Sequence, residues 1–436
     1  MNYKKVKNIF NLREDAFIIL SSIISAIEPG NLVRSFIENN IYEDINNYLN
    51  IIVLGAGKAC APMAKAIETI FPDKIKDSLI IVPDGYKLDT QIINIVEAAH
   101  PLPDQRGLEA TKKIINLIES IEDTDLIIFL FSGGGSALLT CPYPPLTLDH
   151  IISITKELIH CGASIGEINT VRKHLSFVQG GRLGKMVKGT SITLLLSDVT
   201  GNDLSTIASG PTIADLSTFK EAQEILDKYH LTSKISSKII KFLTEGKNNL
   251  FRETPKKLPP KQKNYLVGSN SIALESAYQT ANNLGYNTII LTSMIDGEAR
   301  VIGKIAAKIG KEIHKSSHTL TPPACILIGG ETTVKVIGTG KGGRNQEVAL
   351  SAGLELELDN NILVLSFSTD GKDGPTDACG AYIDAEIMAR ARQLELDGFQ
   401  FLNENNSYNF FLRAGGLIKT SPTYTNVGDI ILVITG

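Results

Sequence analysis

Short apolar runs alternate with helical patterns along almost the whole chain. In the clearest unit, an apolar run over 50–54 is followed by a glycine turn at 55–57 and a helical pattern over 58–70. This alternation is typical of α/β proteins with a mainly parallel sheet. Further strands are predicted at 79–82, 92–96, 126–131 and 192–196, and helices at 108–121 and 148–159. The first half of the chain is therefore predicted to form a doubly wound, Rossmann-like domain.

The second half repeats the alternation after a segment rich in proline and lysine. Residues 245–263 contain Pro255, Pro259 and Pro260 and show no periodic pattern, which indicates a linker or a long surface loop. Beyond it, strands are predicted at 265–267, 288–291, 325–328, 362–367 and 430–434, and helices at 271–284, 297–314, 345–354 and 385–394. We therefore divide the chain into a first α/β domain over 1–244, a linker over 245–263, and a second α/β domain over 264–436.

The N-terminal segment places basic residues before an apolar run over 16–27, and so loosely resembles a signal peptide. Glu14 and Asp15 interrupt the basic region, and no small-residue cleavage site follows, so we predict a helix instead. The run is also too short to span a bilayer, and no membrane association is expected.

Composition narrows the class of protein further. With 43% hydrophobic and 21% charged residues, the 436-residue chain is predicted to fold as a globular protein, neither disordered nor a coiled coil. The 43 basic and 47 acidic residues give a net charge of −4, which does not provide the basic surface that nucleic-acid binding needs. The five cysteines lie far apart without a CxxC pair, so neither a disulfide framework nor a zinc site is predicted, and a reducing cytoplasm is the expected location.

Glycines are concentrated in loops that connect a predicted strand to a predicted helix, at 55–57, 132–136 and 342–343. Such loops present unpaired N–H groups to an anion, as phosphate sites do, although tight turns alone give the same composition. Several such loops together favour phosphate binding. The candidate nucleotide- or phosphate-binding residues are Gly55, Gly57, Ser132, Gly133, Gly134, Gly135, Ser136, Gly342 and Gly343.

Two basic residues are predicted at the starts of helices. Lys58 falls in the first turn of the helix after 55–57, and Arg344 starts the helix after 342–343. A positive charge at this end of the helix dipole costs about 0.3–1 kcal/mol, which solvent could tolerate but which a bound anion would turn into a gain. Because the two residues lie in different halves, they predict an anion-binding cleft between two domains.

Acidic residues follow predicted strands in both halves. Asp198 and Asp203 come after the strand over 192–196, where doubly wound sheets bind ligands, and strand-end carboxylates fit Mg²⁺. Asp370 and Asp373 lie in a loop without the spacing of an EF-hand. Turn formation by aspartate would explain all four residues equally well.

Common nucleotide-binding and nucleophile motifs are incomplete or missing. The turn at 55–58 resembles a dinucleotide-binding turn, but Cys60 stands where the third glycine of that motif belongs. Neither a G-x-x-x-x-G-K-[ST] loop nor the H-R-D and D-F-G motifs of protein kinases occur. Without a G-x-S-x-G nucleophile motif, His100 and His174 are interpreted as structural or substrate-positioning residues, and Cys60 and Cys141 as packing residues.

A series of short motifs spans nearly the whole chain in a fixed order. They are GAGKA at 55–59, EAAHPLPD at 97–104, FSGGGSALL at 131–139, NTVRKHL at 169–175, LLLSDV at 194–199, IASGPT at 207–212, GGETTV at 329–334, GGRNQE at 342–347 and TDGKDGPTDA at 369–378. Together they resemble the class II glycerate kinases, whose C-terminal part is called the MOFRL domain.

The resemblance implies ATP-dependent, Mg²⁺-assisted phosphorylation of D-glycerate to 2-phosphoglycerate, with ATP and glycerate as small-molecule partners. It also implies an active-site cleft between a Rossmann-like N-terminal domain and the MOFRL domain, here about 320–436. Lys58 and Arg344 match the two basic residues that are central to catalysis in the family. We further assign Asp198 to catalysis and, with Asp203, to metal binding. The candidate substrate or cleft residues are His100, Arg172, Glu331, Asn345 and Asp370.

Four positions depart from the family pattern, and two other functions stay open. Gln179 stands for a lysine and Asn202 for an acid, which removes charge near the expected cleft. Ser421 and Tyr424 stand where glycine is usual, and the tyrosine could reshape the acceptor pocket. The glycine turn at 55–57 alone supports an NAD(P)H-dependent hydroxypyruvate reductase, a name that relatives of this family have carried. A nucleotide- or sugar-phosphate-sensing module would use the same loops to bind a ligand without turnover.

Overall fold

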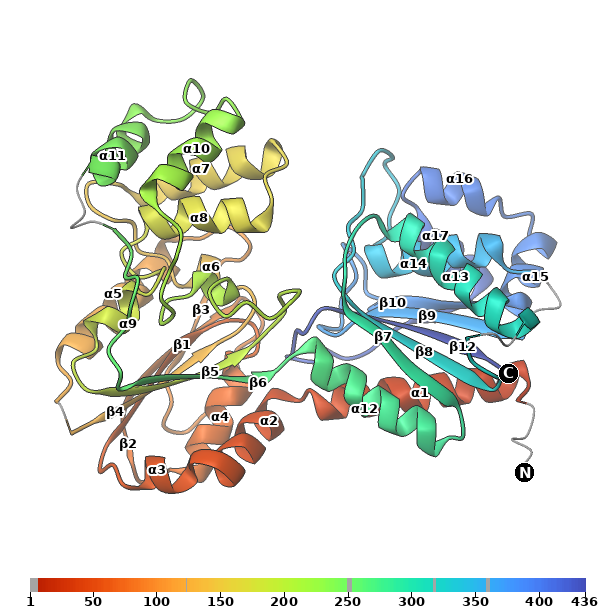
Figure 1. Cartoon of the computed structure of the whole chain (residues 1–436), viewed down its shortest axis with the longest axis horizontal. Coiled ribbons are helices and arrows are strands. Elements are labelled where there is room, and N and C mark those ends of the chain that lie inside the picture. The colour runs from red at the N-terminus through yellow and green to blue at the C-terminus, as the bar shows by residue number, and fades with distance from the viewer. Residues whose placement is uncertain (1–6, 123, 249–252, 317–318, 358–360) are drawn as a thin grey trace. The chain divides into compact units, whose positions relative to one another are not determined.

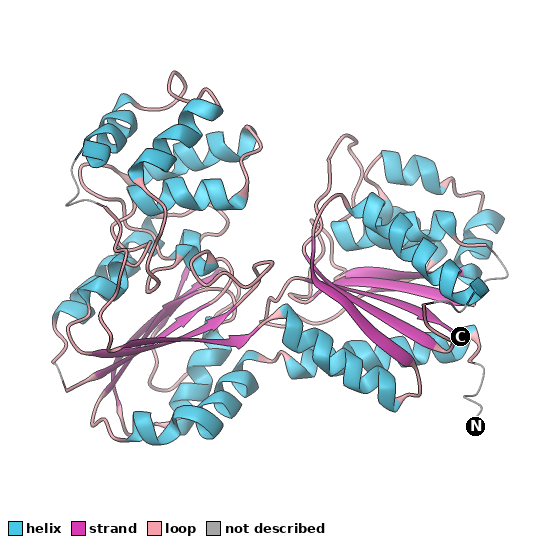
Figure 2. Ribbon diagram, viewed as in Figure 1, coloured by secondary structure: helices cyan, strands magenta, loops and turns pink. Residues whose placement is uncertain are grey.

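The computed structural model describes residues 7–122, 124–248, 253–316, 319–357 and 361–436. These residues form two compact units, each built around one six-stranded sheet (Figures 1 and 2). The first unit comprises 29–197 and 203–268. The second unit comprises the described residues up to 28, the short segment 198–202, and 269–436.

The sheet of the first unit is parallel and has the strand order β3-β2-β1-β4-β5-β6. Its strands are β1 (Ile51–Ala56), β2 (Ile75–Pro83), β3 (Ile95–Ala98), β4 (Leu126–Phe131), β5 (Thr190–Leu196) and β6 (Gln262–Gly268). This is the strand order of the Rossmann fold, so the predicted fold class of the first half is confirmed. The central strands β1 and β4 are buried along their whole length, as continuous apolar runs in a parallel sheet require.

Helices cover both faces of this sheet, and a separate helical group lies beyond one face (Figure 1). The lower face in Figure 1 carries α2 (Pro29–Phe36), α3 (Tyr42–Asn46) and α4 (Cys60–Ile70), with a π-helical turn at Ile37–Ile41. The other face carries α5 (Gln105–Glu119), α6 (Gly135–Leu138) and α9 (Arg182–Met186), with a 3₁₀ turn at Ile207–Ser209. The helical group has its own apolar core and consists of α7 (Leu148–His160), α8 (Ile165–Leu175), α10 (Phe219–Lys228) and α11 (Ser237–Asn248).

The sheet of the second unit is mixed and has the order β11-β10-β9-β12-β8-β7. Its strands are β7 (Asn287–Ile295), β8 (Ala324–Gly330), β9 (Ile362–Ser368), β10 (Gly380–Asp384), β11 (Leu417–Ile418) and β12 (Asp429–Thr435). β7 pairs in parallel with β8, whereas β12 runs antiparallel between β8 and β9, and the pairings of β10 are also antiparallel. The prediction of a mainly parallel sheet is therefore wrong for this half. β12 is buried throughout, so its sequence is as apolar as that of a central parallel strand.

Helices also cover both faces of the second sheet (Figure 2). One face carries α1 (Ile9–Ala26) and α12 (Asn270–Asn283), and the other carries α13 (Ala299–Ser316) and α14 (Arg344–Glu355), next to α15 (Ala385–Gln393), α16 (Gly398–Asn403) and α17 (Ser407–Ala414). The helix predicted at the N-terminus is confirmed, because α1 buries one apolar face against α12. In the described part of the chain, no single helix is long and apolar enough to cross a membrane, and α1 passes that test only as a bent pair with the helical stretch Pro29–Asn46.

The units differ from the predicted domain limits at two places. β6 begins in the last two residues of the predicted linker and continues into the predicted second domain, yet it belongs to the first sheet, and α1 packs in the second unit. Within 245–263, α11 continues to Asn248, and residues 249–252 lie outside the described residues. Thr254 is buried, and the Glu253 carboxylate lies 2.9 Å from His174 Nε2. This part of the segment is therefore packed against the first unit and is not a free surface linker.

Candidate functional site

The loops that follow β1 and β4 meet at one edge of the first sheet. The Lys58 N–H donates to the Gly133 carbonyl at 2.9 Å, and the Ala59 N–H donates to Ser132 Oγ at 3.0 Å. The strand order changes direction between β1 and β4, and doubly wound sheets bind ligands beyond the strand ends at this point. The structure thus brings together two of the predicted phosphate loops, while phosphate binding by them stays a prediction.

Lys58 lies just outside helix α4, in contrast to the predicted placement. The helix begins at Cys60, with Ala59 as its N-cap, so Lys58 does not occupy the first turn and the dipole argument for it weakens. Cys60, which replaces the third glycine of a dinucleotide-binding turn, is fully buried with Sγ 3.3 Å from the Leu130 carbonyl. Burial raises the pKa of this thiol to about 12, so it acts as a packing residue.

Three basic side chains from three different elements gather around the two loops. Lys58 follows β1, His100 follows β3, and Arg172 belongs to α8. Gly134 has φ 84°, and a Cβ there would lie 3.2 Å from the His100 ring and 3.5 Å from Lys58 Cγ, so a glycine lets both side chains approach. Desolvation by the surrounding chain, and the charges of Lys58 and Arg172, hold the pKa of His100 well below its ordinary value. His100 is therefore neutral at pH 7, within a positive field that favours an anion.

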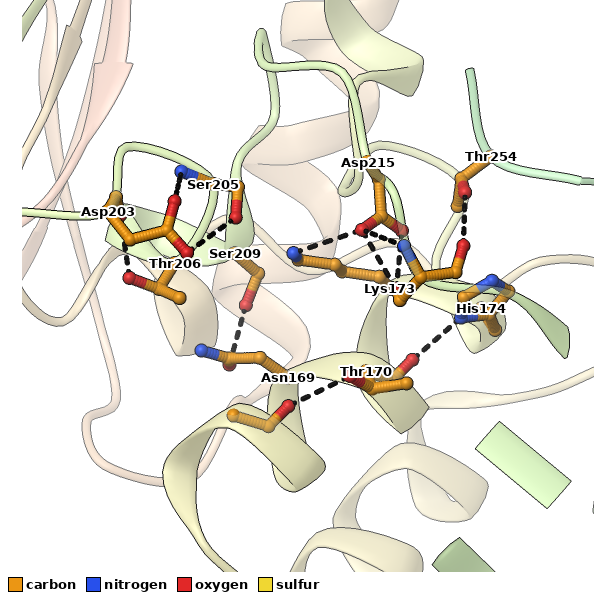
Figure 3. Close-up of polar contacts among 12 residues, drawn as sticks. Asn169, Thr170, Lys173, His174, Asp203, Ser205, Thr206, Ser209, Asp215 and Thr254 are labelled. Atoms are coloured by element: carbon orange, nitrogen blue, oxygen red, sulfur yellow. Dashed lines mark hydrogen bonds and ion pairs between the residues drawn. The ribbon is translucent and has the colours of Figure 1, made fainter. Parts of the chain in front are cut away.

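The two neighbours of Arg172 in its motif have acidic partners. Lys173 Nζ lies 3.2 Å from Asp215 Oδ1 (Figure 3). His174 Nε2 lies 2.9 Å from the Glu253 carboxylate, and its Nδ1 lies 2.7 Å from the Thr170 carbonyl (Figure 3). Both residues are buried. This burial supports the first of the two predicted interpretations of His174, that of a structural residue. Arg172 differs from them, because no hydrogen bond or ion pair of its guanidinium is found within the described residues, and burial lowers its pKa to about 10.

A strained turn ties the glycine loop to helix α8. Ala208, Ser209 and Gly210 all have left-handed backbones, with φ of 51°, 59° and 58°, which costs about 1–2 kcal/mol for each non-glycine residue. The Ser209 hydroxyl lies 3.0 Å from Asn169 Oδ1 (Figure 3). It also lies 2.8 Å from Ser136 Oγ. Sequence reasoning missed the role of Ser209, because nothing in its local pattern indicates positive φ.

The two predicted metal ligands have different surroundings. Asp203 holds its own loop, accepting from the Ser205 N–H at 2.9 Å and the Ser205 hydroxyl at 3.0 Å (Figure 3). Asp198 Oδ2 accepts from the Asn426 side chain at 3.2 Å. No group of three or more His, Cys, Asp or Glu side chains is arranged to hold a metal in the part of the chain that the structure describes. Binding of Mg²⁺ by Asp198 and Asp203 stays a prediction, and it relies on the preference of this cation for one or two carboxylates beside substrate phosphates and water.

Arg344 in the second unit is held by two carboxylates. It is the first residue of α14, as predicted, with Nε 2.7 Å and Nη2 3.0 Å from the two oxygens of Asp429. Its Nη1 lies 2.6 Å from Glu331 Oε1. The charge at this helix start is thus compensated within the chain and does not by itself require a bound anion. Asp429, the first residue of β12, was not among the predicted site residues.

Asp373 occupies the N-terminus of α14. Its carboxylate accepts the N–H groups of Asn345 at 3.1 Å and Gln346 at 2.9 Å, so the helix is capped by the protein itself. A Cβ at Gly343 would collide with this carboxyl, and one at Gly342 with the hydroxyl of Ser407. Close packing therefore accounts for both glycines, and their role in phosphate binding stays a prediction.

The other predicted cleft residues of the second unit belong to the same sheet edge. The buried Asn345 donates to Asp429 Oδ1 at 3.0 Å, and Glu331 directly follows β8. Asp370 closes a turn, accepting from the Ser368 hydroxyl at 2.9 Å and the Lys372 N–H at 3.0 Å. β12 runs antiparallel to β8 and β9, so its start lies beside the carboxyl ends of both. The structure thus brings Arg344, Asn345 and Glu331 together.

Three of the departures from the family pattern take different structural roles. Gln179 Nε2 donates to the carbonyls of Ser136 at 2.9 Å and Leu139 at 3.1 Å, and so fixes the end of the glycine loop. Tyr424 has φ 53°, a conformation that glycine adopts without strain, and Asn202 has φ 55°. The backbone at Tyr424 thus keeps the conformation that a glycine there would favour.

Asp373 is expected to make stability depend on pH. Burial raises its pKa to about 7, against the lowering effect of two backbone N–H donors. The folded state then binds this proton more tightly than the unfolded state, so the free energy of unfolding falls as pH rises from about 4 to about 7, by at most about 1.4 kcal/mol per pH unit. Urea unfolding across this range should show the fall in the wild type and in Glu275→Gln, an exposed position of α12. The fall should be smaller in Asp373→Asn, where only the buried Asp429, with a pKa raised to about 6, still contributes to it. An unchanged slope in Asp373→Asn would contradict the assignment.

Comparisons with known proteins agree with this architecture. The family model described as "Domain of unknown function (DUF4147)" matches residues 15–244, and that of the "MOFRL family" matches 324–429. The chain is 40% identical to a glycerate 2-kinase of Pyrococcus horikoshii, over 88% of this chain and 87% of that protein. It is 37% identical to a putative hydroxypyruvate reductase of Agrobacterium vitis, over 88% of this chain and 87% of that protein. A crystal structure of glycerate kinase from Thermotoga maritima matches with a TM-score of 0.88 and 36% identity, covering 98% of this chain and 99% of that one.

Two domain models in this order, on a Rossmann-type unit and a mixed α/β unit, define a two-domain α/β enzyme of the kinase class. The chain belongs to the glycerate 2-kinase family that carries a MOFRL domain, and the resemblance seen in the sequence motifs is confirmed.

Proposed function

We propose that this protein phosphorylates D-glycerate on its 2-hydroxyl with ATP, giving 2-phosphoglycerate and ADP. The observation that carries the proposal is family membership over nearly the whole length of the chain, with relatives named glycerate kinases. The cluster of Lys58, His100 and Arg172 around two strand-end loops supports it, because the reaction needs a site that attracts anions. A kinase of this family uses a nucleotide as its phosphate donor, and ATP is the donor that we propose.

Phosphoryl transfer requires alignment and charge stabilisation more than covalent help. In the proposed mechanism Lys58, at the loops after β1 and β4, and Arg344, fixed by Asp429 and Glu331, stabilise the charge that spreads over the transferred phosphoryl group. Asp198 and Asp203 would hold Mg²⁺, which supplies neutralisation of the phosphate charge when bound.

A hydroxypyruvate reductase is the second candidate, because relatives carry that name and the loop at 55–57 follows the first strand of a Rossmann unit. Two observations weigh against a dinucleotide site. Cys60 fills the position of the third glycine, and Asp84, the acid just after β2, forms two hydrogen bonds to Arg106 at 2.7 and 2.9 Å. An acid at that strand end would otherwise bind the ribose hydroxyls of NAD.

One paired assay tests the proposal. Purified protein with MgATP and D-glycerate is expected to release ADP, and the ³¹P spectrum of the product should be that of 2-phosphoglycerate. The same preparation with NADH and hydroxypyruvate is expected to leave the absorbance of NADH unchanged. Oxidation of NADH without ADP release would select the reductase, and ligand binding without either product would select a sensing module.

A further inference from the structure

Arg172 is a partly buried arginine that, within the described residues, lacks the acidic partner that its neighbours have. The adjacent Lys173 and His174 are matched by Asp215 and Glu253, and Arg344 in the second unit has both Asp429 and Glu331. The guanidinium of Arg172 makes no such contact within the described residues, although the surrounding chain desolvates it. A desolvated guanidinium without a counterion is unfavourable in the empty protein, so its placement favours an anionic ligand.

The surroundings of Arg172 indicate where that ligand lies. A cavity of about 10 Å³ contacts Arg172, Ser136 and Gln179, and this volume holds about one water molecule. An organic anion does not fit there and would contact the guanidinium outside this cavity, in the positive surroundings that Arg172 and Lys58 create at His100. Gln179 holds the glycine loop at Ser136. Ser209 connects this loop to Asn169 of α8, the helix that also carries Arg172.

The chemistry of the two arginines separates their roles. A guanidinium binds a carboxylate best through two parallel N–H groups. In Arg344, all three guanidinium nitrogens already lie beside carboxylates: Nη2 donates to Asp429 Oδ1, Nε lies 2.7 Å from Asp429 Oδ2, and Nη1 donates to Glu331. Arg172 keeps its fork available among the described residues.

We propose that Arg172 binds the carboxylate of the acceptor and restricts the acceptor to small 2-hydroxy carboxylates. The inference rests on the proposed kinase function and assigns the substrate-recognition part of the same site. His100, neutral beside Arg172 and Lys58, then lies next to the acceptor as a hydrogen-bonding group. Lys58, where the loops after β1 and β4 meet, is then available to bind the phosphoryl group.

Steady-state kinetics of Arg172→Ala and Arg172→Lys test this assignment. Loss of a bidentate charged contact is expected to raise KM for D-glycerate about 100-fold in Arg172→Ala, while KM for MgATP changes less than about 3-fold. Arg172→Lys should recover only part of the loss, because an ammonium lacks the fork. Guanidinium ion added to Arg172→Ala should restore activity. Arg34→Ala, which removes an exposed arginine from the same unit, is the matched control and should behave as wild type.

The neutral amide of D-glycerate gives a second readout. Wild type should prefer glycerate to glyceramide by about 100-fold or more in kcat/KM, and this preference should collapse in Arg172→Ala. A rise in KM for MgATP instead, with KM for glycerate unchanged, would overturn the proposal and place a phosphate at Arg172. Equal loss for both acceptors without guanidinium rescue would show a structural role only, and a thermal melt of Arg172→Lys identifies a folding defect.

Calorimetric titration with D-glycerate alone separates failure of the inference from failure of the proposed function. Heat of binding in wild type that is lost in Arg172→Ala, without ADP formation in the assay, supports carboxylate binding and refutes the kinase. ADP formation with the same KM for glycerate in wild type and Arg172→Ala supports the kinase and refutes the role of Arg172.

Discussion

Replacing Lys58 or Arg344 with alanine is expected to lower kcat/KM for glycerate phosphorylation by about 10²–10³-fold or more, the scale for removing one group that stabilises transition-state charge. Each side chain is proposed to stabilise charge on the transferred phosphoryl group, so the loss of either removes one positive charge from it. The loss should appear mainly in kcat, because the charge that they stabilise develops in the transition state. ADP release coupled to a pyruvate kinase assay measures it.

Matched controls keep this test specific. Lys65→Ala removes an exposed lysine from α4, and Arg392→Ala removes an exposed arginine from α15. Each control removes one positive charge, as the test variants do, from a helix position outside the loops of the site. Arg344→Ala also leaves the buried Asp429 without its cation, so a thermal melt and the milder Arg344→Lys accompany it. Near-normal kinetics in both alanine variants would remove the proposed mechanism.

The sequence predicted the first unit well, because its signals are local. The buried run at 126–131 coincides with β4, and every predicted strand of the first sheet overlaps an observed one. Strand direction in the second sheet was not readable. A strand such as β12, buried on both faces, is apolar throughout whichever way it runs, and only its neighbours β8 and β9 define its direction.

The candidate site was predictable where loops carry the signal and unpredictable where distant partners do. The loops after β1 and β4 were identified from glycine spacing alone, and their meeting follows from parallel neighbours. The compensation of Arg344 was missed because Asp429 lies 85 positions further along the chain. The cap that Asp373 forms is likewise distant, 28 positions beyond Asn345. A charge at a helix start therefore suggests an external anion only until tertiary partners are known.

Asp429 is the partner on which the position of Arg344 depends. It is 1% exposed, whereas Glu331 on the same guanidinium is a largely solvated side chain after β8. Asp429→Asn keeps the shape but turns an amide N–H toward Nε or Nη2 of Arg344 and removes the charge that compensates it. We expect the free energy of unfolding to fall by about 2–4 kcal/mol, as for a broken buried ion pair that keeps some solvent access.

Asp429→Asn should lower kcat by a larger factor than it changes KM, because the Arg344 side chain is still present but loses its fixed orientation. Urea unfolding and steady-state kinetics at a temperature below both transitions measure the two effects separately. Glu331→Gln provides the comparison on the same guanidinium, and because that pair is exposed its loss should cost less than about 1 kcal/mol. Equal stability losses in Asp429→Asn and Glu331→Gln would show that burial does not distinguish the two contacts. The buried Asp429 carboxylate is proposed to orient the guanidinium so that its other N–H groups can contact the phosphoryl group. Unchanged kcat in a folded Asp429→Asn would therefore mean that the function of Arg344 does not depend on the ion pair with Asp429.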